Sequence, residues 1–154
     1  MPELVKKRLG EILIENGVLT PENLEEALNH QKREGGLIGQ ILIRMGYISE
    51  ENLIAAIGKQ LRVPYLPLSQ YAVNSEAAEI LGEDFCRKNL LMGFDQDDKR
   101  IFLALSDPLN TQVLLEIQKK TNLKPQVFIS TPTEILNMMD LVFSAAKRAA
   151  KKAG

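Results

Sequence analysis

The sequence predicts an α+β protein in which a tandem helical repeat subdomain precedes a small α/β subdomain with a mixed sheet. Two observations support this prediction. A pattern of 24 residues occurs twice, in residues 8–31 and 37–60. Beyond the second copy, short apolar runs alternate with helical patterns, as in α/β units. We therefore expect a repeat subdomain in residues 1–62, an α/β subdomain in 63–145 and a basic tail in 146–154.

Composition and charge narrow the class of protein. A chain of 154 residues can bury a hydrophobic core. Its net charge of −1 argues against binding a long nucleic acid through a broad basic face, whereas a small anionic ligand needs only local donors. Cys86 is the only cysteine, so no internal disulfide can form. No 18-residue apolar run occurs, which argues against membrane insertion, and we expect a cytoplasmic protein.

The repeat is clear from the two aligned copies, RLGEILIENGVLTPENLEEALNHQ and LIGQILIRMGYISEENLIAAIGKQ. The second copy begins 29 residues after the first, and ten of the 24 positions are identical. The identical pairs are Gly10/Gly39, Ile12/Ile41, Leu13/Leu42, Ile14/Ile43, Gly17/Gly46, Glu22/Glu51, Asn23/Asn52, Leu24/Leu53, Ala27/Ala56 and Gln31/Gln60. Such density at one fixed offset indicates a tandem duplication.

Each copy is predicted to form a short helix, a glycine stop and a longer helix. Gly17 and Gly46 can take the left-handed conformation that closes a helix. Thr20 is the expected N-cap of the first long helix, with Pro21 at its first position, and Ser49 is the expected N-cap of the second. The glycine pair 35–36 ends the first long helix, and the proline at position 64 stops the second.

Neither copy has enough apolar surface to be stable alone, so the two should pack about a pseudo-twofold axis. The repeat could serve only as a core, but three features favour a ligand. Gly10 and Gly39 precede expected helix starts, where free N–H groups can approach a phosphate. Gln31 and Gln60 fall on apolar helical stripes and need polar partners. Arg8 has the planar fork that suits the O6/N7 edge of guanine.

The pattern RLG-x-x-[LIV]-[LIV]-x-x-G-[LIV]-[LIV]-x₄-L-x₃-L-x₂-Q, repeated after a five-residue spacer, resembles the MshEN domain. That domain lies at the N-terminus of ATPases of type II secretion and type IV pilus assembly, and its known ligand is cyclic di-GMP. The resemblance implies that each copy holds one half of this twofold-symmetric dinucleotide. The first half-site would consist of Arg8, Leu9, Gly10, Leu24, Leu28 and Gln31, and the second of Ile38, Gly39, Leu53, Ile57 and Gln60.

The second copy departs from the pattern at its head, where Leu37 stands in place of arginine. A bidentate contact between arginine and guanine contributes about 1–3 kcal/mol, so its loss would weaken binding by roughly one to two orders of magnitude. Arg44 belongs to the same copy but stands seven positions later, so the alignment alone does not make it a substitute.

The rest of the chain is predicted to form the α/β subdomain. Ser75 is the expected cap of a short helix that ends before Gly82. Apolar runs at 90–94 and 101–105 flank a polar turn and predict a β-hairpin. Asp107 is expected to cap a helix that begins at Pro108 and buries Leu109.

A strand at 126–130 should follow this helix and pair with the hairpin through a parallel crossover. Thr131 and Glu134 have capping-box spacing and open the last helix, in which Met138 and Met139 are expected to fill the core. Residues 104–139 also resemble the α/β half of the MshEN module.

No catalytic or metal-binding set emerges from the sequence. The chain lacks a G-x-x-x-x-G-K-[ST] loop, so the ATPase that normally follows the MshEN module is not within it, and we expect no enzyme activity and no metal. His30 is the single histidine; a surface position is its default interpretation, with a place beside the ligand as the alternative. Cys86 is expected to be a buried small apolar residue.

These features favour a non-enzymatic regulatory module that binds cyclic di-GMP and signals to a secretion or pilus motor. Its expected partners are cyclic di-GMP and secretion or pilus assembly proteins. The alternative is a docking adapter without a small ligand, which binds an inner-membrane partner of the secretion apparatus and in which the repeat is a scaffold. Under either hypothesis a partner could hold this cytoplasmic module at the inner face of the inner membrane. Titration with cyclic di-GMP separates the two hypotheses.

Overall fold

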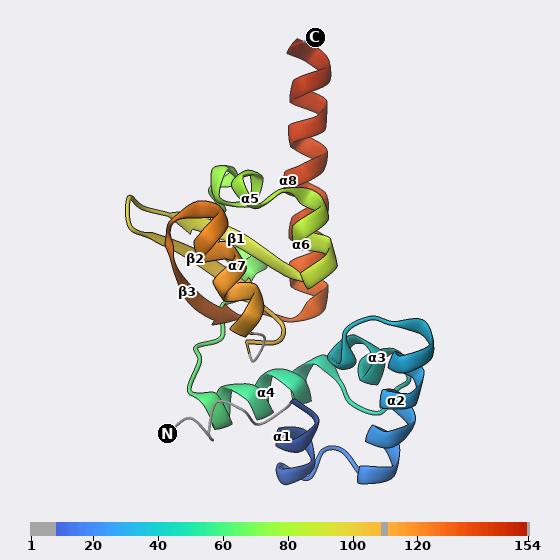
Figure 1. Ribbon diagram of the computed structural model, residues 1–154. Coiled ribbons are helices and arrows are strands. Elements are labelled where there is room, and N and C mark those ends of the chain that lie inside the picture. The colour runs from blue at the N-terminus through green and yellow to red at the C-terminus, as the bar shows by residue number, and fades with distance from the viewer. Residues whose placement is uncertain (1–8, 109–110, 154) are drawn as a thin grey trace. The chain divides into compact units, whose positions relative to one another are not determined.

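The computed structural model describes residues 9–108 and 111–153, with side chains through Ser144. The chain forms two compact units, Met1–Pro64 and Tyr65–Gly154. The described part of the first unit contains helices only, and the second contains a three-stranded mixed sheet with helices packed on it (Figure 1). The predicted fold class, a helical repeat followed by a small α/β part, is confirmed.

The first unit repeats the same short and long helices in each copy. Its helices are α1 (Leu9–Glu15), α2 (Pro21–Glu34), α3 (Ile38–Arg44) and α4 (Glu50–Leu61). Gly17 and Gly46 have φ of 74° and 80°, which confirms their predicted left-handed conformation.

The N-caps of the long helices are also equivalent. The Thr20 hydroxyl oxygen accepts the Asn23 N–H at 3.1 Å, and the Ser49 oxygen accepts the Asn52 N–H at 3.0 Å. Both caps were predicted, and both satisfy an otherwise free donor of the first helical turn. The end of α4 differs from the prediction. Arg62 closes the helix in the left-handed conformation (φ 55°), before the proline at position 64 is reached.

The two copies pack by exchanging partners. Helix α1 packs against α4, and α2 packs against α3. In both pairs the short helix of one copy packs against the long helix of the other copy. This reciprocal packing is what a pseudo-twofold axis between the copies produces. The interface is apolar, and its fully buried side chains include Ile12, Leu13, Ile41, Leu42, Leu53 and Ile57. Each short helix is therefore stabilised by the long helix of the other copy.

The second unit is built on a sheet of strand order β1-β2-β3. Its helices are α5 (Ser75–Leu81), α6 (Glu83–Asn89), α7 (Thr111–Thr121) and α8 (Pro132–Ala153), and its strands are β1 (Leu91–Gln96), β2 (Arg100–Leu105) and β3 (Lys124–Ile129); a short 3₁₀ turn, η2, spans Leu68–Gln70. Strands β1 and β2 form the predicted antiparallel hairpin, with a bulge between Gly93 and Asp95. Strand β3 is parallel to β2, as expected for a crossover through α7.

Helices cover this sheet and bury its apolar residues. Helix α5 packs on β1, α7 packs on β3, and α8 contacts both α6 and β1 (Figure 1). The core includes Leu81, Leu91, Met92, Ile101, Leu103, Ile117, Ile135 and Met139. Met139 is fully buried and Met138 half-buried, which agrees with the predicted core role of this pair.

The start of α8 is the predicted capping box. The Thr131 hydroxyl oxygen accepts the Glu134 N–H at 3.1 Å, and the Glu134 carboxylate accepts the Thr131 N–H at 3.2 Å. The Tyr65 hydroxyl donates to the same carboxylate at 2.7 Å. Local desolvation, followed by this hydrogen bond, raises the pKa of Tyr65 to about 12.

Two predicted helix starts in this unit are wrong. Asn74 caps α5, because its side-chain oxygen accepts the Glu76 N–H at 3.1 Å, and Ser75 is the first helical residue. Helix α7 begins at Thr111, whereas Pro108 lies in a turn. Leu109, which we expected on the apolar face of that helix, lies outside the described residues.

Substitution of Gly93 tests how tightly α5 packs on the sheet. A Cβ at Gly93 would lie 2.5 Å from the backbone oxygen of Ala77, which cannot move without shifting α5. We expect Gly93→Ala to lower the free energy of unfolding of the second unit by about 1–3 kcal/mol, measured by urea denaturation.

The matched control is Gly58→Ala within α4. The nearest atom to its added Cβ is the Val63 oxygen at 3.8 Å, an ordinary contact. Because alanine is a better helix former than glycine, this variant should gain about 0.5–1 kcal/mol. A Gly93→Ala protein as stable as the parent would contradict the close packing of α5 on β1.

Candidate ligand site between the two repeats

We call Leu9 and Gly10 the head of the first copy, and Ile38 and Gly39 the head of the second. Both heads lie inside helices. Leu9 and Gly10 are the first two residues of α1, and Ile38 and Gly39 are the first two of α3. Both glycines were expected just before a helix start, so that prediction is corrected by one or two positions. They still belong to the first helical turn, where backbone N–H groups have no partner within the helix.

Close packing accounts for the glycine at each head. A Cβ at Gly10 would lie 2.7 Å from both methyl carbons of Leu24. At Gly39 it would lie 3.3 Å from a methyl carbon of Leu9 and 3.9 Å from one of Leu53. Each head therefore contacts the leucine of its own long helix, and Leu9 of the first copy lies against Gly39 of the second. The structure thus brings the heads of the two predicted half-sites together.

The predicted site residues differ in how much surface a ligand could reach. Leu9, Leu53 and Ile57 are buried in the core, with exposed fractions of 3%, 1% and 0%. The half-buried members are Leu24, Leu28, Gln31, Ile38 and Gly39, whereas Gly10 is buried and Gln60 is exposed. Arg8 lies outside the described residues. The predicted site residues open to a ligand are therefore the half-buried set and Gln60, whereas Leu9, Leu53 and Ile57 belong to the core.

Gln31 has a structural partner that the sequence did not indicate. Its amide nitrogen donates to the backbone oxygen of Gly36 at 2.9 Å. This bond ties the long helix of the first copy to the spacer that leads into the second copy. Gln31 thus fixes the path of the chain immediately before Leu37, the position at which the second copy lacks arginine.

A second tie between the copies was also missed. The Tyr47 hydroxyl donates to the Glu26 carboxylate, which joins the turn after α3 to α2. This hydrogen bond, followed by desolvation, raises the pKa of Tyr47. The alignment gives no signal for the pair, because Val18 and Ala55 occupy the equivalent positions.

The first unit also contains a polar hollow of about 540 Å³. It lies where α2 ends, and His30, Glu34, Gly35, Gly36 and Arg44 line it. His30 is half-buried rather than at the surface, and its Nδ1 atom is buried without a hydrogen-bond partner in the described structure.

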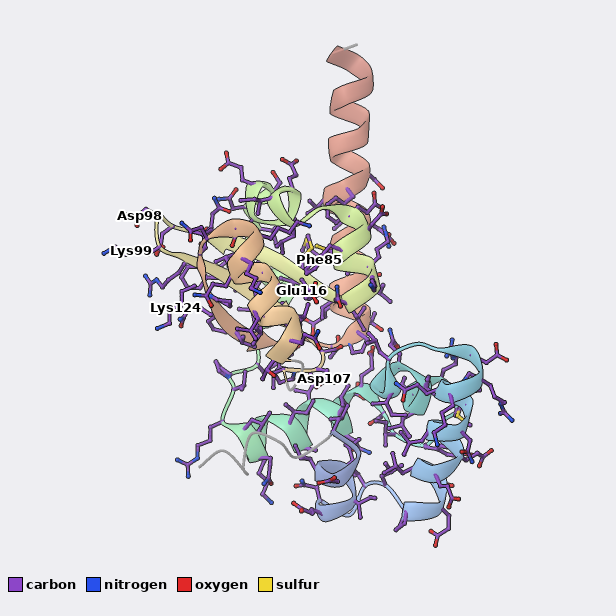
Figure 2. The ribbon with its side chains drawn as sticks, viewed as in Figure 1. Phe85, Asp98, Lys99, Asp107, Glu116 and Lys124 are labelled. Carbon is purple, nitrogen blue, oxygen red and sulfur yellow. The ribbon has the colours of Figure 1, made fainter. Side chains whose placement is uncertain are left out.

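Two further hollows lie in the second unit. Asp98 and Lys99 at the hairpin tip, with Lys124 nearby, line one of about 410 Å³ (Figure 2). Phe85 of α6 and Glu116 of α7 line another of about 380 Å³, in which the Lys120 ammonium lies 4.6 Å from the centre of the Phe85 ring. Charged side chains of both signs line each hollow, and none of the lining residues has a buried side-chain polar atom without a partner in the described structure.

Within residues 9–108 and 111–153, no group of three or more His, Cys, Asp or Glu side chains could hold a metal ion. No helix in that part of the chain is both long enough and apolar enough to cross a membrane.

The architecture defines a two-part module: a duplicated helical unit joined to a small α/β unit. The MshEN domain family matches residues 61–149, more than half of the chain. This chain therefore belongs to the MshEN family, as its sequence predicted. The matched residues lie almost entirely in the second unit, so the family assignment is independent of the repeat and of the residues predicted to bind ligand.

Solved structures extend the likeness over both units. A structure of MshE with cdg (cyclic di-GMP) is 28% identical to this chain, with a TM-score of 0.66, and the comparison covers 89% of this chain and 99% of that one. The N-terminal domain of XpsE shares the fold at 20% identity, with a TM-score of 0.69 and coverage of 88% and 94%.

A curated relative, the type IV pilus assembly ATPase PilB of Myxococcus xanthus (strain DK1622), is 22% identical over 137 residues. The match covers 89% of this chain but 24% of that protein. The chain thus spans about a quarter of the length of the relative.

Cys86 provides a test of the packing beneath α6. It is fully buried, and burial raises the pKa of its thiol to about 12. At pH 8 we expect the native protein to resist Ellman's reagent and the denatured protein to release one thiol equivalent.

The raised pKa also makes stability depend on alkaline pH. Between about pH 9 and 12 the unfolded chain loses the thiol proton while the folded chain retains it, so stability falls by about 1.4 kcal/mol per pH unit in this window. Cys86→Ala should lack this component of the pH dependence. Rapid reaction of the native thiol at pH 8 would contradict the buried environment.

Proposed function

We propose that this chain is a non-enzymatic regulatory module of a secretion or pilus motor system, and that it binds cyclic di-GMP between its two repeats. The contact between Leu9 of the first copy and Gly39 of the second carries the proposal. It brings together the heads that the resemblance assigns to the two halves of one ligand.

Symmetry supports this assignment. Cyclic di-GMP has twofold symmetry, and the reciprocal packing of α1 on α4 and of α2 on α3 supplies a pseudo-twofold surface to match it. The first turns of α1 and α3 offer free N–H donors for the two phosphates. The half-buried apolar side chains Leu24, Leu28 and Ile38 would cover the bases.

Arg8 supplies the base recognition in the first half-site. It directly precedes Leu9, the residue that contacts the opposite copy. A guanidinium at this position can pair with O6 and N7 of guanine in a bidentate geometry. The likeness to MshE, whose structure contains cyclic di-GMP, supports guanine as the base.

The proposed regulation follows from the binding of one ligand to both copies. A ligand held by both heads binds most tightly to conformations in which the two copies keep the packing seen here. Binding therefore increases the population of those conformations, by an amount set by the difference in affinity between them and the others. The likeness to PilB supports a pilus assembly ATPase as the recipient of the signal. A cytoplasmic location is part of the same proposal.

Isothermal titration with cyclic di-GMP tests the proposal. We expect saturable binding, and a dissociation constant roughly tenfold or more higher in Arg8→Ala, because a bidentate guanine contact is lost. Lys7→Ala removes the same charge one position away and is the matched control, with affinity expected within about twofold of the parent.

Failure of the parent chain to release or absorb heat at high micromolar ligand would refute nucleotide binding. The repeat would then be better described as the scaffold of a docking adapter. Equal losses in Arg8→Ala and Lys7→Ala would assign the effect to general electrostatics rather than to base recognition.

A further inference from the structure

We propose that the hollow beside the spacer is a guanine subsite, in which Arg44 supplies the guanidinium that the second copy lacks at position 37. This inference rests on the proposed binding of cyclic di-GMP and assigns the base contact of its second half. The residues concerned are His30, Glu34, Gly35, Gly36 and Arg44, which line the hollow of about 540 Å³.

The position of Arg44 relative to Leu37 supports this assignment. Leu37 is the N-cap of α3 and Arg44 is its last residue. Seven residues make almost two helical turns, so the two positions share one face of α3, about 10 Å apart along its axis. The hollow runs from Gly36, the neighbour of Leu37, to Arg44. A ligand lying along this face would meet Arg44 about 10 Å farther along α3 than it would meet an arginine at position 37.

The hollow also adjoins the first half-site. The Gln31 amide, predicted to bind ligand, donates to the backbone oxygen of Gly36 on its rim. Gly35 and Gly36 have φ of 76° and 103°, which favour glycine, and they leave the rim without side chains. A base seated there would lie next to the surface proposed for the rest of the dinucleotide.

The polar groups around the hollow lack partners within the described residues. His30 Nδ1 is buried and unbonded. Arg44 and Glu34 are exposed, and neither side chain forms a hydrogen bond or ion pair with any described residue. Three polar side chains therefore line one space without bonding to one another, and the exposed side chains of Arg44 and Glu34 are free to bind a ligand there.

Their chemistry selects guanine over adenine. The guanidinium of Arg44 can donate two hydrogen bonds to O6 and N7. The carboxylate of Glu34 accepts only, and it complements the N1–H and N2–H₂ donors on the other edge of guanine. Adenine has an amino donor in place of O6, so it cannot accept a hydrogen bond from Arg44 at that position. It also has no N1–H to donate to Glu34. The other ring nitrogen of His30, Nε2, can form a hydrogen bond with a base edge or a sugar hydroxyl.

The test compares cyclic di-GMP with cyclic di-AMP by isothermal titration of the whole chain. We expect Arg44→Ala to weaken cyclic di-GMP binding by about tenfold or more and to narrow the preference for cyclic di-GMP over cyclic di-AMP. Glu34→Gln should narrow that preference as well. Arg33→Ala is the matched control, because Arg33 is exposed in the last turn of α2 and does not line the hollow.

A rescue variant separates base recognition from an indirect effect. Leu37→Arg combined with Arg44→Ala restores the guanidinium at the head of the second copy, and we expect it to recover the affinity lost in Arg44→Ala. Circular dichroism melts should be unchanged in Arg44→Ala, since this side chain is exposed.

The outcomes distinguish the two proposals. Tight binding by the parent, loss in Arg8→Ala and an Arg44→Ala affinity within about twofold of the parent would overturn the subsite and leave the proposed function standing. No binding by the parent would overturn both. Equal loss in Arg33→Ala and Arg44→Ala would also overturn the subsite, since net charge alone would then explain the effect.

Discussion

The first unit depends on the packing of each short helix against the long helix of the other copy. Helices α1 and α3 have seven residues each, too few to be stable in water by themselves. Ile12, Leu13, Ile41 and Leu42 are fully buried, so almost all of their apolar surface is removed from water on packing. A single copy would leave this surface exposed. The duplication is therefore a requirement for folding.

The same constraint explains why the heads meet. Because the partners are exchanged, the starts of α1 and α3 approach the axis that relates the copies, and Leu9 comes to lie against Gly39. The proposed site therefore borders the core: Leu9, Leu53 and Ile57 are buried in it, while Leu24, Leu28 and Ile38 remain partly open. A ligand across the heads would rest on side chains whose positions the core already fixes, so little ordering is needed on binding.

Local signals made much of this fold predictable. Thr20, Ser49 and the Thr131–Glu134 box are caps with known spacing, and Gly17 and Gly46 allow the left-handed turns that end the short helices. The misses arose where neighbouring residues compete. Asn74 and Ser75 can both cap α5, and only the backbone geometry selects the asparagine. The hollow, the unbonded His30 nitrogen and the bond from Gln31 to Gly36 depend on how α2, the spacer and α3 fold together, which no spacing encodes.

The departures from exact repetition are as informative as the repeats. A symmetric ligand on a pseudo-symmetric protein needs equivalent chemistry from each copy, but not from equivalent positions. Arg8 stands before Leu9, whereas its counterpart Leu37 cannot donate a hydrogen bond from its side chain, and the nearest guanidinium on that face of α3 is Arg44, almost two turns away. The Tyr47–Glu26 bond also has no counterpart, since Val18 and Ala55 cannot form it. The duplication thus conserves the packing that both copies need, and its two halves have diverged at polar positions, where a different side chain leaves the core unchanged.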